Sequence, residues 1–162
     1  MGSHPTISRR RLVIGLMVSP LAASATTVLA AEALPKMTVT KDPNCGCCSG
    51  WVDHVSKAGF AVEVVESPEI NRVKARLGVP QALASCHTAE IGGYVIEGHV
   101  PADSIKRLLA EKPQGRGLAV AGMPVGSPGM EVEGMEPDTY EVILFGPSGQ
   151  RPFARYTGGR QA

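Results

Sequence analysis

The sequence predicts a single small α/β domain that follows an N-terminal segment of different character. Strand-like and helix-like patterns alternate from residue 37 onward, which is typical of a sheet with right-handed crossover connections. A length of 162 residues suits one domain. A clear strand pattern at 140–145, followed by a Gly-Pro-Ser-Gly turn, predicts a hairpin at the end of the chain.

Residues 1–30 have the three parts of a signal peptide. A basic start at Arg9–Arg11 precedes an apolar stretch from Leu12 to Leu29, and small residues follow at the exit. The pair Arg9-Arg10 also resembles a twin-arginine export signal, and ordinary secretion stays open. The apolar stretch is interrupted at Ser19-Pro20, so we expect no retained membrane span and an exported mature protein.

Charge excludes some partners. Arg9, Arg10 and Arg11 are three of the 16 basic residues, whereas all 15 acidic residues follow residue 30, so the mature part is slightly acidic. It has no basic patch or charge run, and we expect no nucleic-acid partner. We expect a linker at 31–36, a domain at 37–157 and a tail at 158–162.

The first half of the domain is predicted element by element. Met37–Lys41 alternates as a strand, and a helix should cover about 46–58. Residues 61–65 form a second predicted strand. Ser67-Pro68 should cap a second helix, with the proline at its first position, and Gly78 should end it.

The second half contains one more helix and a long loop. Residues 94–96 are strand-like, and a helix should follow Pro101 and stop at Pro113. Ten of the 27 residues from Pro113 to Thr139 are Gly or Pro, which argues against a regular element there and predicts a long ordered loop. Residues 151–156 should pair back on the strand at 140–145.

Four cysteines carry the chemistry. A Cys-x-x-Cys spacing directly after the first strand, at a helix start, is the thioredoxin-like arrangement. The helix dipole and free N–H groups there favour thiolates, which are nucleophiles and metal ligands. In thioredoxin-like folds the segment before the third strand lies against this turn, and Ser85-Cys86-His87 occupies that position. The cluster is Cys45, Cys47, Cys48 and Cys86.

Three interpretations of this cluster stay open. The cysteines bind a metal, or Cys45 and Cys48 form a redox dithiol of a thiol–disulfide oxidoreductase, or they form a structural disulfide. Convergence of a fourth sulfur favours metal. Several thiolates with thioethers from Met123 and Met130 suit Cu(I), whereas a zinc site usually shows two Cys-x-x-Cys pairs.

The histidines are less informative, and Trp51 is expected to be a core anchor. His87 adjoins Cys86 and is the best imidazole ligand, with a hydrogen-bonded turn residue as the alternative. His54 should lie too far along its helix to reach the same ion. His99 precedes a helix and is expected only to cap it.

Several blocks together resemble the CopG-like family of bacterial periplasmic copper-binding proteins. They are residues 42–48 with Trp51, 85–88, 93–101, and 122–130, in matching order. The resemblance implies a thioredoxin-like domain that binds copper through its cysteines, serves in copper homeostasis or resistance, and interconverts Cu(I) and Cu(II). It also implies copper ions and other periplasmic copper-handling proteins as partners. The matching site positions are Cys45, Cys47, Cys48, Cys86, Met123 and Met130.

Overall fold

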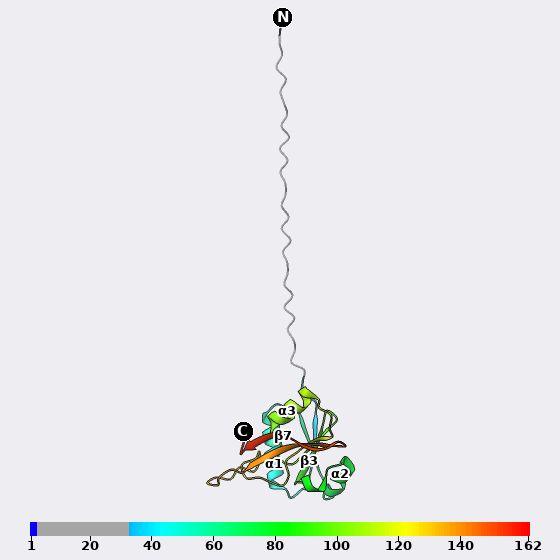
Figure 1. Cartoon of the computed structure of the whole chain (residues 1–162), viewed down its shortest axis with the longest axis vertical. Coiled ribbons are helices and arrows are strands. Elements are labelled where there is room, and N and C mark those ends of the chain that lie inside the picture. Colours follow the sequence, from blue (N-terminus) through cyan, green and yellow to red (C-terminus); the bar gives the residue numbers. More distant parts are fainter. Residues whose placement is uncertain (3–32) are drawn as a thin grey trace. The chain divides into compact units, whose positions relative to one another are not determined.

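Secondary structure elements follow the predicted order through the first half of the domain. The computed structural model describes residues 1–2 and 33–162, so the predicted signal peptide lies almost wholly outside the described residues. Residues Ala33–Ala162 form one compact unit (Figure 1). The strands are β1 Met37–Lys41, β2 Val62–Glu66, β3 His87–Ile91, β4 Tyr94–Glu97, β5 Gly117–Ala119, β6 Thr139–Gly146, β7 Gly149–Thr157 and β8 Arg160–Gln161. The helices are α1 Gly46–Lys57, α2 Ile70–Leu77, α3 Ala102–Glu111 and a short 3-10 helix Gln81–Leu83.

The strands form one mixed sheet in the order β2-β1-β3-β4-β5-β6-β7-β8. Strand β1 pairs in parallel with β2 and antiparallel with β3, and β4 pairs in parallel with β5. The α/β class and the terminal hairpin of β6 and β7 are therefore confirmed. The thioredoxin-like identity of the sheet remains a prediction.

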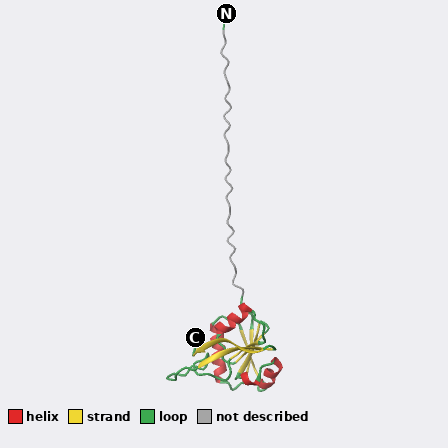
Figure 2. Cartoon of the chain, viewed as in Figure 1, coloured by secondary structure: helices red, strands yellow, loops and turns green. Residues whose placement is uncertain are grey.

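Helices cover both faces of this sheet, as Figure 2 shows. Neighbouring residues of a strand point to opposite faces, and the apolar side chains of β4 and β5 accordingly divide between two clusters. The larger cluster joins Ile96 and Leu118 to α1 and α3. The smaller one joins Val95 and Ala119 to Leu77 of α2. Burial on both faces explains the unbroken apolar runs at 94–96 in β4 and 117–119 in β5.

Trp51 of α1 is the predicted core anchor, and this is confirmed. Its side chain is fully buried, and its indole Nε1–H donates to the carbonyl oxygen of Val100 over 2.9 Å. The bond spans from α1 to the turn before α3. The two helices on this face are thereby held in a fixed relation above the sheet.

Three boundaries differ from the sequence predictions. Helix α2 begins at Ile70 rather than at Pro68: the Ser67 hydroxyl accepts the Glu69 amide, but Glu69 has φ −101° and ψ 33°, outside the helical region. Strand β5 lies inside the segment expected to contain no regular element; Gly117 faces the Val95 carbonyl so closely that a side chain there would collide. Residues 160–161, expected in a tail, extend the sheet as β8.

The segment between β5 and β6, residues 120–138, contains neither helix nor strand and is called the methionine loop below. It has internal hydrogen bonds, including those from the amides of Gly126 to Met130 and Met130 to Ser127. Ser127 is fully buried. The loop is thus ordered, as predicted.

The helices that the structure describes all lie within residues 33–162. None of these helices is long and apolar enough to cross a bilayer.

Candidate metal centre

Cys45 lies at the N-terminus of α1, where the sequence predicts it. The Asp42 carboxylate accepts the Asn44 amide over 2.8 Å, and the Asp42 carbonyl accepts the Cys45 amide over 3.1 Å. This turn delivers Cys45 as the N-cap residue of the helix. The Cys45 side chain makes no capping hydrogen bond, so it does not satisfy the free N–H groups of the first turn, whose partial positive charge favours thiolates nearby.

Cys86 lies at the same end of the sheet as the start of α1, because the last residue of β1, Lys41, pairs with the first residue of β3, His87. It lies between the 3-10 helix and β3, and its Sγ is 3.8 Å from Sγ of Cys47. The convergence of the four sulfurs, predicted from chain topology alone, is present. The ligand atoms of Cys45, Cys47, Cys48 and Cys86 all lie within 4.8 Å of one another.

Two of the four sulfurs are bonded in this structure. Cys45 and Cys48 form a disulfide, whereas Cys47 and Cys86 are free thiols. Sγ of Cys47 lies 3.5 Å from Sγ of Cys45, next to that bond. The structure therefore represents an oxidised form of the cluster, and four thiols require its reduction by two electrons and two protons.

Two histidines place ring nitrogens close to the sulfur of Cys86. Nδ1 of His87 lies 3.3 Å from Sγ of Cys86, and Nε2 of His99 lies 3.1 Å from the same sulfur. The three ligand atoms also lie within 4.8 Å of one another. Cys86 is thus common to a sulfur group and a nitrogen group.

His99 is a site residue that sequence reasoning missed. The expectation that it only caps α3 is wrong, because its Nδ1 bonds the Pro128 carbonyl over 2.8 Å and its Nε2 faces Cys86. A signal was present: Gly92-Gly93 forms the turn of the β3–β4 hairpin, which pairs Thr88 with Glu97. Continuing that register by two residues places Cys86 opposite His99.

The two histidines are held in their neutral form. Burial lowers the pKa of His87 well below its ordinary value, with His99 and then Lys74 adding to the effect. Burial also lowers the pKa of His99, against the opposing effect of the Pro128 carbonyl. Nε2 of His87 is buried and has no hydrogen-bond partner among the described residues. Neutral imidazoles are the form that binds metals.

The thiol of Cys86 is held in its protonated form. Burial, followed by the neighbouring Cys47, raises the pKa of Cys86 to about 11, and the Ser85 hydroxyl opposes this. A metal binding here would have to displace that proton.

The methionine loop brings the thioether of Met123 to the cysteines. Sδ of Met123 lies 4.0 Å from Sγ of Cys47, and the Met123 side chain is 53% exposed. Met130 makes backbone bonds within the loop, and its thioether remains a predicted ligand. Gly129 packs the loop against α1. Its φ is +83°, and an added Cβ would lie 2.5 Å from the backbone nitrogen of Trp51.

His54 lies apart from the cysteines, as predicted. Its Nε2 accepts the Ala102 amide over 3.1 Å and so caps α3 from α1. His54 therefore does for α3 what was expected of His99.

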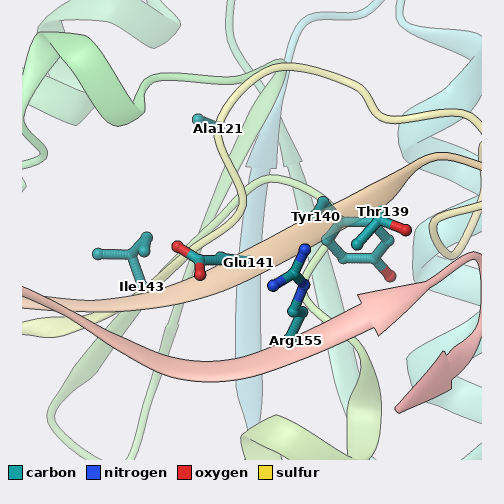
Figure 3. Close-up of a pocket in the computed structure, with 6 residues that line it drawn as sticks. All are labelled: Ala121, Thr139, Tyr140, Glu141, Ile143 and Arg155. Atoms are coloured by element: carbon teal, nitrogen blue, oxygen red, sulfur yellow. The ribbon is translucent and has the colours of Figure 1, made fainter. Parts of the chain in front are cut away.

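A separate hollow of about 350 Å³ lies on β6 and β7 (Figure 3). In Figure 3 Glu141 projects from β6, Arg155 from β7, and Ala121 lies on the methionine loop above them. Its lining contains no sulfur or imidazole, so it contributes no donor to the candidate metal centre.

Comparison with known proteins gives the family. Two solved structures named copper resistance protein CopG, forms 1 and 2, are each 44% identical to this chain. The match to form 1 covers 99% of that protein and 77% of this chain, with a TM-score of 0.71. For form 2 the values are 98%, 76% and 0.72. The chain belongs to the CopG-like family.

One further comparison finds a family model, and another finds no match. A family model described as "Protein of unknown function, DUF411" matches residues 83–130, which include Cys86, His99 and Met123. No curated protein sequence matches this chain. In this member of the CopG-like family, the sulfur and nitrogen donors around Cys86 form groups that could hold a metal ion.

Proposed function

We propose that this chain is a periplasmic copper-binding protein of copper homeostasis or resistance, which binds Cu(I) through its reduced cysteine cluster. The observation that carries the proposal is the approach of Cys86 to Cys47 across 39 positions of sequence. A dithiol enzyme needs two cysteines. A third and fourth sulfur within 4.8 Å fit a metal site better than redox chemistry alone.

The donor set favours copper over zinc. Thiolates and thioethers are soft ligands that select Cu(I), and the Met123 thioether lies 4.0 Å from Cys47. Both similar solved structures are named copper resistance proteins. We propose the four cysteines as primary ligands, His87 and His99 as imidazole ligands, and Met123 and Met130 as thioether ligands. Adjacent thiolates of Cys47 and Cys48 can bridge two ions.

Two features of the proposal concern the chain beyond its site. A thioredoxin-like domain accounts for a Cys-x-x-Cys segment that begins at the N-cap of α1, the helix after β1, with Cys86 placed before β3. Export by the signal peptide predicted at residues 1–30 would deliver this domain to the periplasm. Other copper-handling proteins of that compartment are the proposed partners, and interconversion of Cu(I) and Cu(II) is a proposed activity.

An anaerobic titration tests the proposal. The reduced mature chain is titrated with Cu(I) against a competing chelator, and free thiols are counted before and after. Tight binding that protects all four thiols is expected. Weak binding would contradict the proposal, and preferential binding of zinc, with unfolding on chelation, would indicate a zinc-stapled structural module.

A second candidate function is thiol–disulfide exchange, which the Cys45–Cys48 disulfide favours. Cys45 is partly exposed and Cys48 is fully buried, so an external thiolate would attack Sγ of Cys45 and release the Cys48 thiolate. A disulfide-exchange assay distinguishes the two functions. Catalytic turnover that needs Cys45 and Cys48 but not Cys86 would favour the oxidoreductase.

A further inference from the structure

A buried ion pair lies behind the cysteine cluster. Nζ of Lys74 on α2 is 2.6 Å from Oε1 of Glu97 at the end of β4, and the two side chains are 6% and 0% exposed. Nζ of Lys74 also donates to Oγ1 of Thr88 on β3 over 2.8 Å, and that hydroxyl donates to Oε2 of Glu97 over 2.6 Å. Every member of this network is buried and bonded.

Such a pair needs a reason beyond stability. Removing two charges from water costs several kcal/mol per ion, and a buried pair is often no more stable than apolar residues of similar volume. Buried charged pairs in other proteins can fix one arrangement against alternatives. The question is therefore which arrangement this network fixes.

The network ends on the residue before Cys86. Oε1 of Glu97, which bonds Lys74, also accepts the backbone amide of Ser85 over 2.6 Å. Gly98 keeps this contact close, because φ is +69° there and an added Cβ would lie 2.7 Å from Ser85. The carboxylate thus holds the segment that carries Cys86 from within the fold.

Ser85 also reaches the methionine loop. Its hydroxyl donates to the carbonyl oxygen of Gly122, the residue before Met123. Ser85 therefore bonds the buried network with its backbone amide and the methionine loop with its side chain. Cys86 follows Ser85 in the chain and Met123 follows Gly122. The sulfur atoms of both residues contact Sγ of Cys47.

We propose that Lys74 and Glu97 are positioning residues, which hold the Ser85 amide and thereby fix Cys86 against the cysteines of α1. Neither side chain belongs to the groups of donors that could hold a metal ion. Lys74 neutralises the carboxylate, and the carboxylate oxygen holds the amide. This inference rests on the proposed copper-binding function, since Cys86 is positioned for a ligand role.

Two charge-neutral double variants isolate the oxygen that holds Ser85. Lys74→Met/Glu97→Gln removes both charges but retains a side-chain oxygen that accepts the amide. Lys74→Met/Glu97→Leu removes the charges and the oxygen. The matched control is Lys36→Met/Glu63→Leu, which deletes an exposed ion pair between the segment before β1 and strand β2. Each reduced protein is assayed for thermal unfolding, Cu(I) affinity and the alkylation rate of Cys86.

We expect the glutamine variant and the control to bind Cu(I) within about threefold of wild type. The leucine variant, which loses the hydrogen bond to the Ser85 amide, should bind about tenfold more weakly and expose Cys86 to alkylation about tenfold faster. A folded leucine variant that matches the glutamine variant in both measurements would overturn the proposal. Restoration by glutamine separates positioning from a general loss of stability.

Hydrogen exchange in the wild-type protein covers the case in which the leucine variant does not fold. The Ser85 amide should exchange far more slowly than the amides of the exposed segment 132–136. Equal rates would mean that Glu97 does not hold Ser85. If the wild-type protein fails to bind Cu(I), the proposed function fails, while Ser85 exchange and Cys86 alkylation still decide the positioning.

Discussion

Nε2 of His99 lies 3.1 Å from Sγ of Cys86, and its other ring nitrogen bonds the Pro128 carbonyl of the methionine loop. The imidazole is fully buried. One side chain therefore connects the loop to the sulfur that completes the cluster. A change at His99 should affect metal binding through Cys86 and loop placement through Pro128, and the two effects can be separated.

Replacing His99 by asparagine should weaken Cu(I) binding by at least about tenfold. The shorter amide can still donate from near the Nδ1 position to Pro128, but it presents no nitrogen to Cys86. Competition with a Cu(I) chelator gives the affinity. The matched control is His54→Gln, a histidine change outside the cluster, which should leave affinity unchanged; equal losses in both variants would contradict a ligand role for His99.

Cys86→Ser should weaken Cu(I) binding on the order of 100-fold. Loss of a residue that only hydrogen-bonds a metal ligand typically lowers metal affinity by about 10- to 100-fold, and loss of the ligand itself should cost at least as much. The hydroxyl is a similar but harder donor. Far-ultraviolet circular dichroism of the reduced protein checks the fold. Unchanged affinity in a folded variant would exclude Cys86 from the metal site.

Alkylation without reductant should label two cysteines, Cys47 and Cys86, and full reduction should make all four reactive. Cys47 should react first, because the raised pKa of Cys86, about 11, leaves almost no thiolate at neutral pH. Mass spectrometry of peptides gives the sites and rates. Labelling of four cysteines in untreated protein would mean that the isolated protein lacks the disulfide.

Gly129→Ala should destabilise the domain by about 1–3 kcal/mol and weaken Cu(I) binding, since the new Cβ would lie 2.5 Å from the backbone nitrogen of Trp51. Denaturant unfolding measures the stability. Gly134→Ala is the control: φ is +79° there, but no atom lies within 4 Å of the added Cβ. It should cost only about 1 kcal/mol and spare affinity. Equal effects would show that the contact with α1 is unimportant.

Acid should destabilise the domain partly through His54. Burial lowers the pKa of His54 below its ordinary 6.5, Lys57 of its own helix adds to this, and Glu131 and Asp103 oppose it. The unfolded chain then binds the proton more readily, so the stabilisation is complete above pH 6.5 and is lost as pH falls below that value.

His54→Gln tests this pH dependence, because glutamine can still accept the Ala102 amide but does not titrate. The melting temperature of the variant should fall less steeply than that of wild type between about pH 6.5 and 5. Buried His87 and His99 keep part of the slope in both proteins. Identical dependence of the melting temperature on pH in the two proteins would exclude His54 as a source of the acid destabilisation.

Local sequence determined the elements and much of the site. Alternation specified β1, Gly78 ended α2 as predicted with a left-handed backbone, and Cys45 began the first helix. These features depend on side chains within a few residues of one another. The boundary at α2 was missed because Glu69 leaves helical geometry after the Ser67 turn, and no local sequence signal marks that backbone conformation.

Tertiary structure decided what no local pattern contains. The Lys74–Glu97 pair joins a helix to a strand 23 positions away, and a lysine on an amphipathic helix ordinarily faces water. The role of His99 depended on hairpin register, and the reach of Met123 on the contact of Gly129 with α1. Sequence by itself determined which donors the chain carries and where the first helix presents them. Only the packed fold decided which of them meet, because contacts between distant segments depend on the register and separation of whole elements.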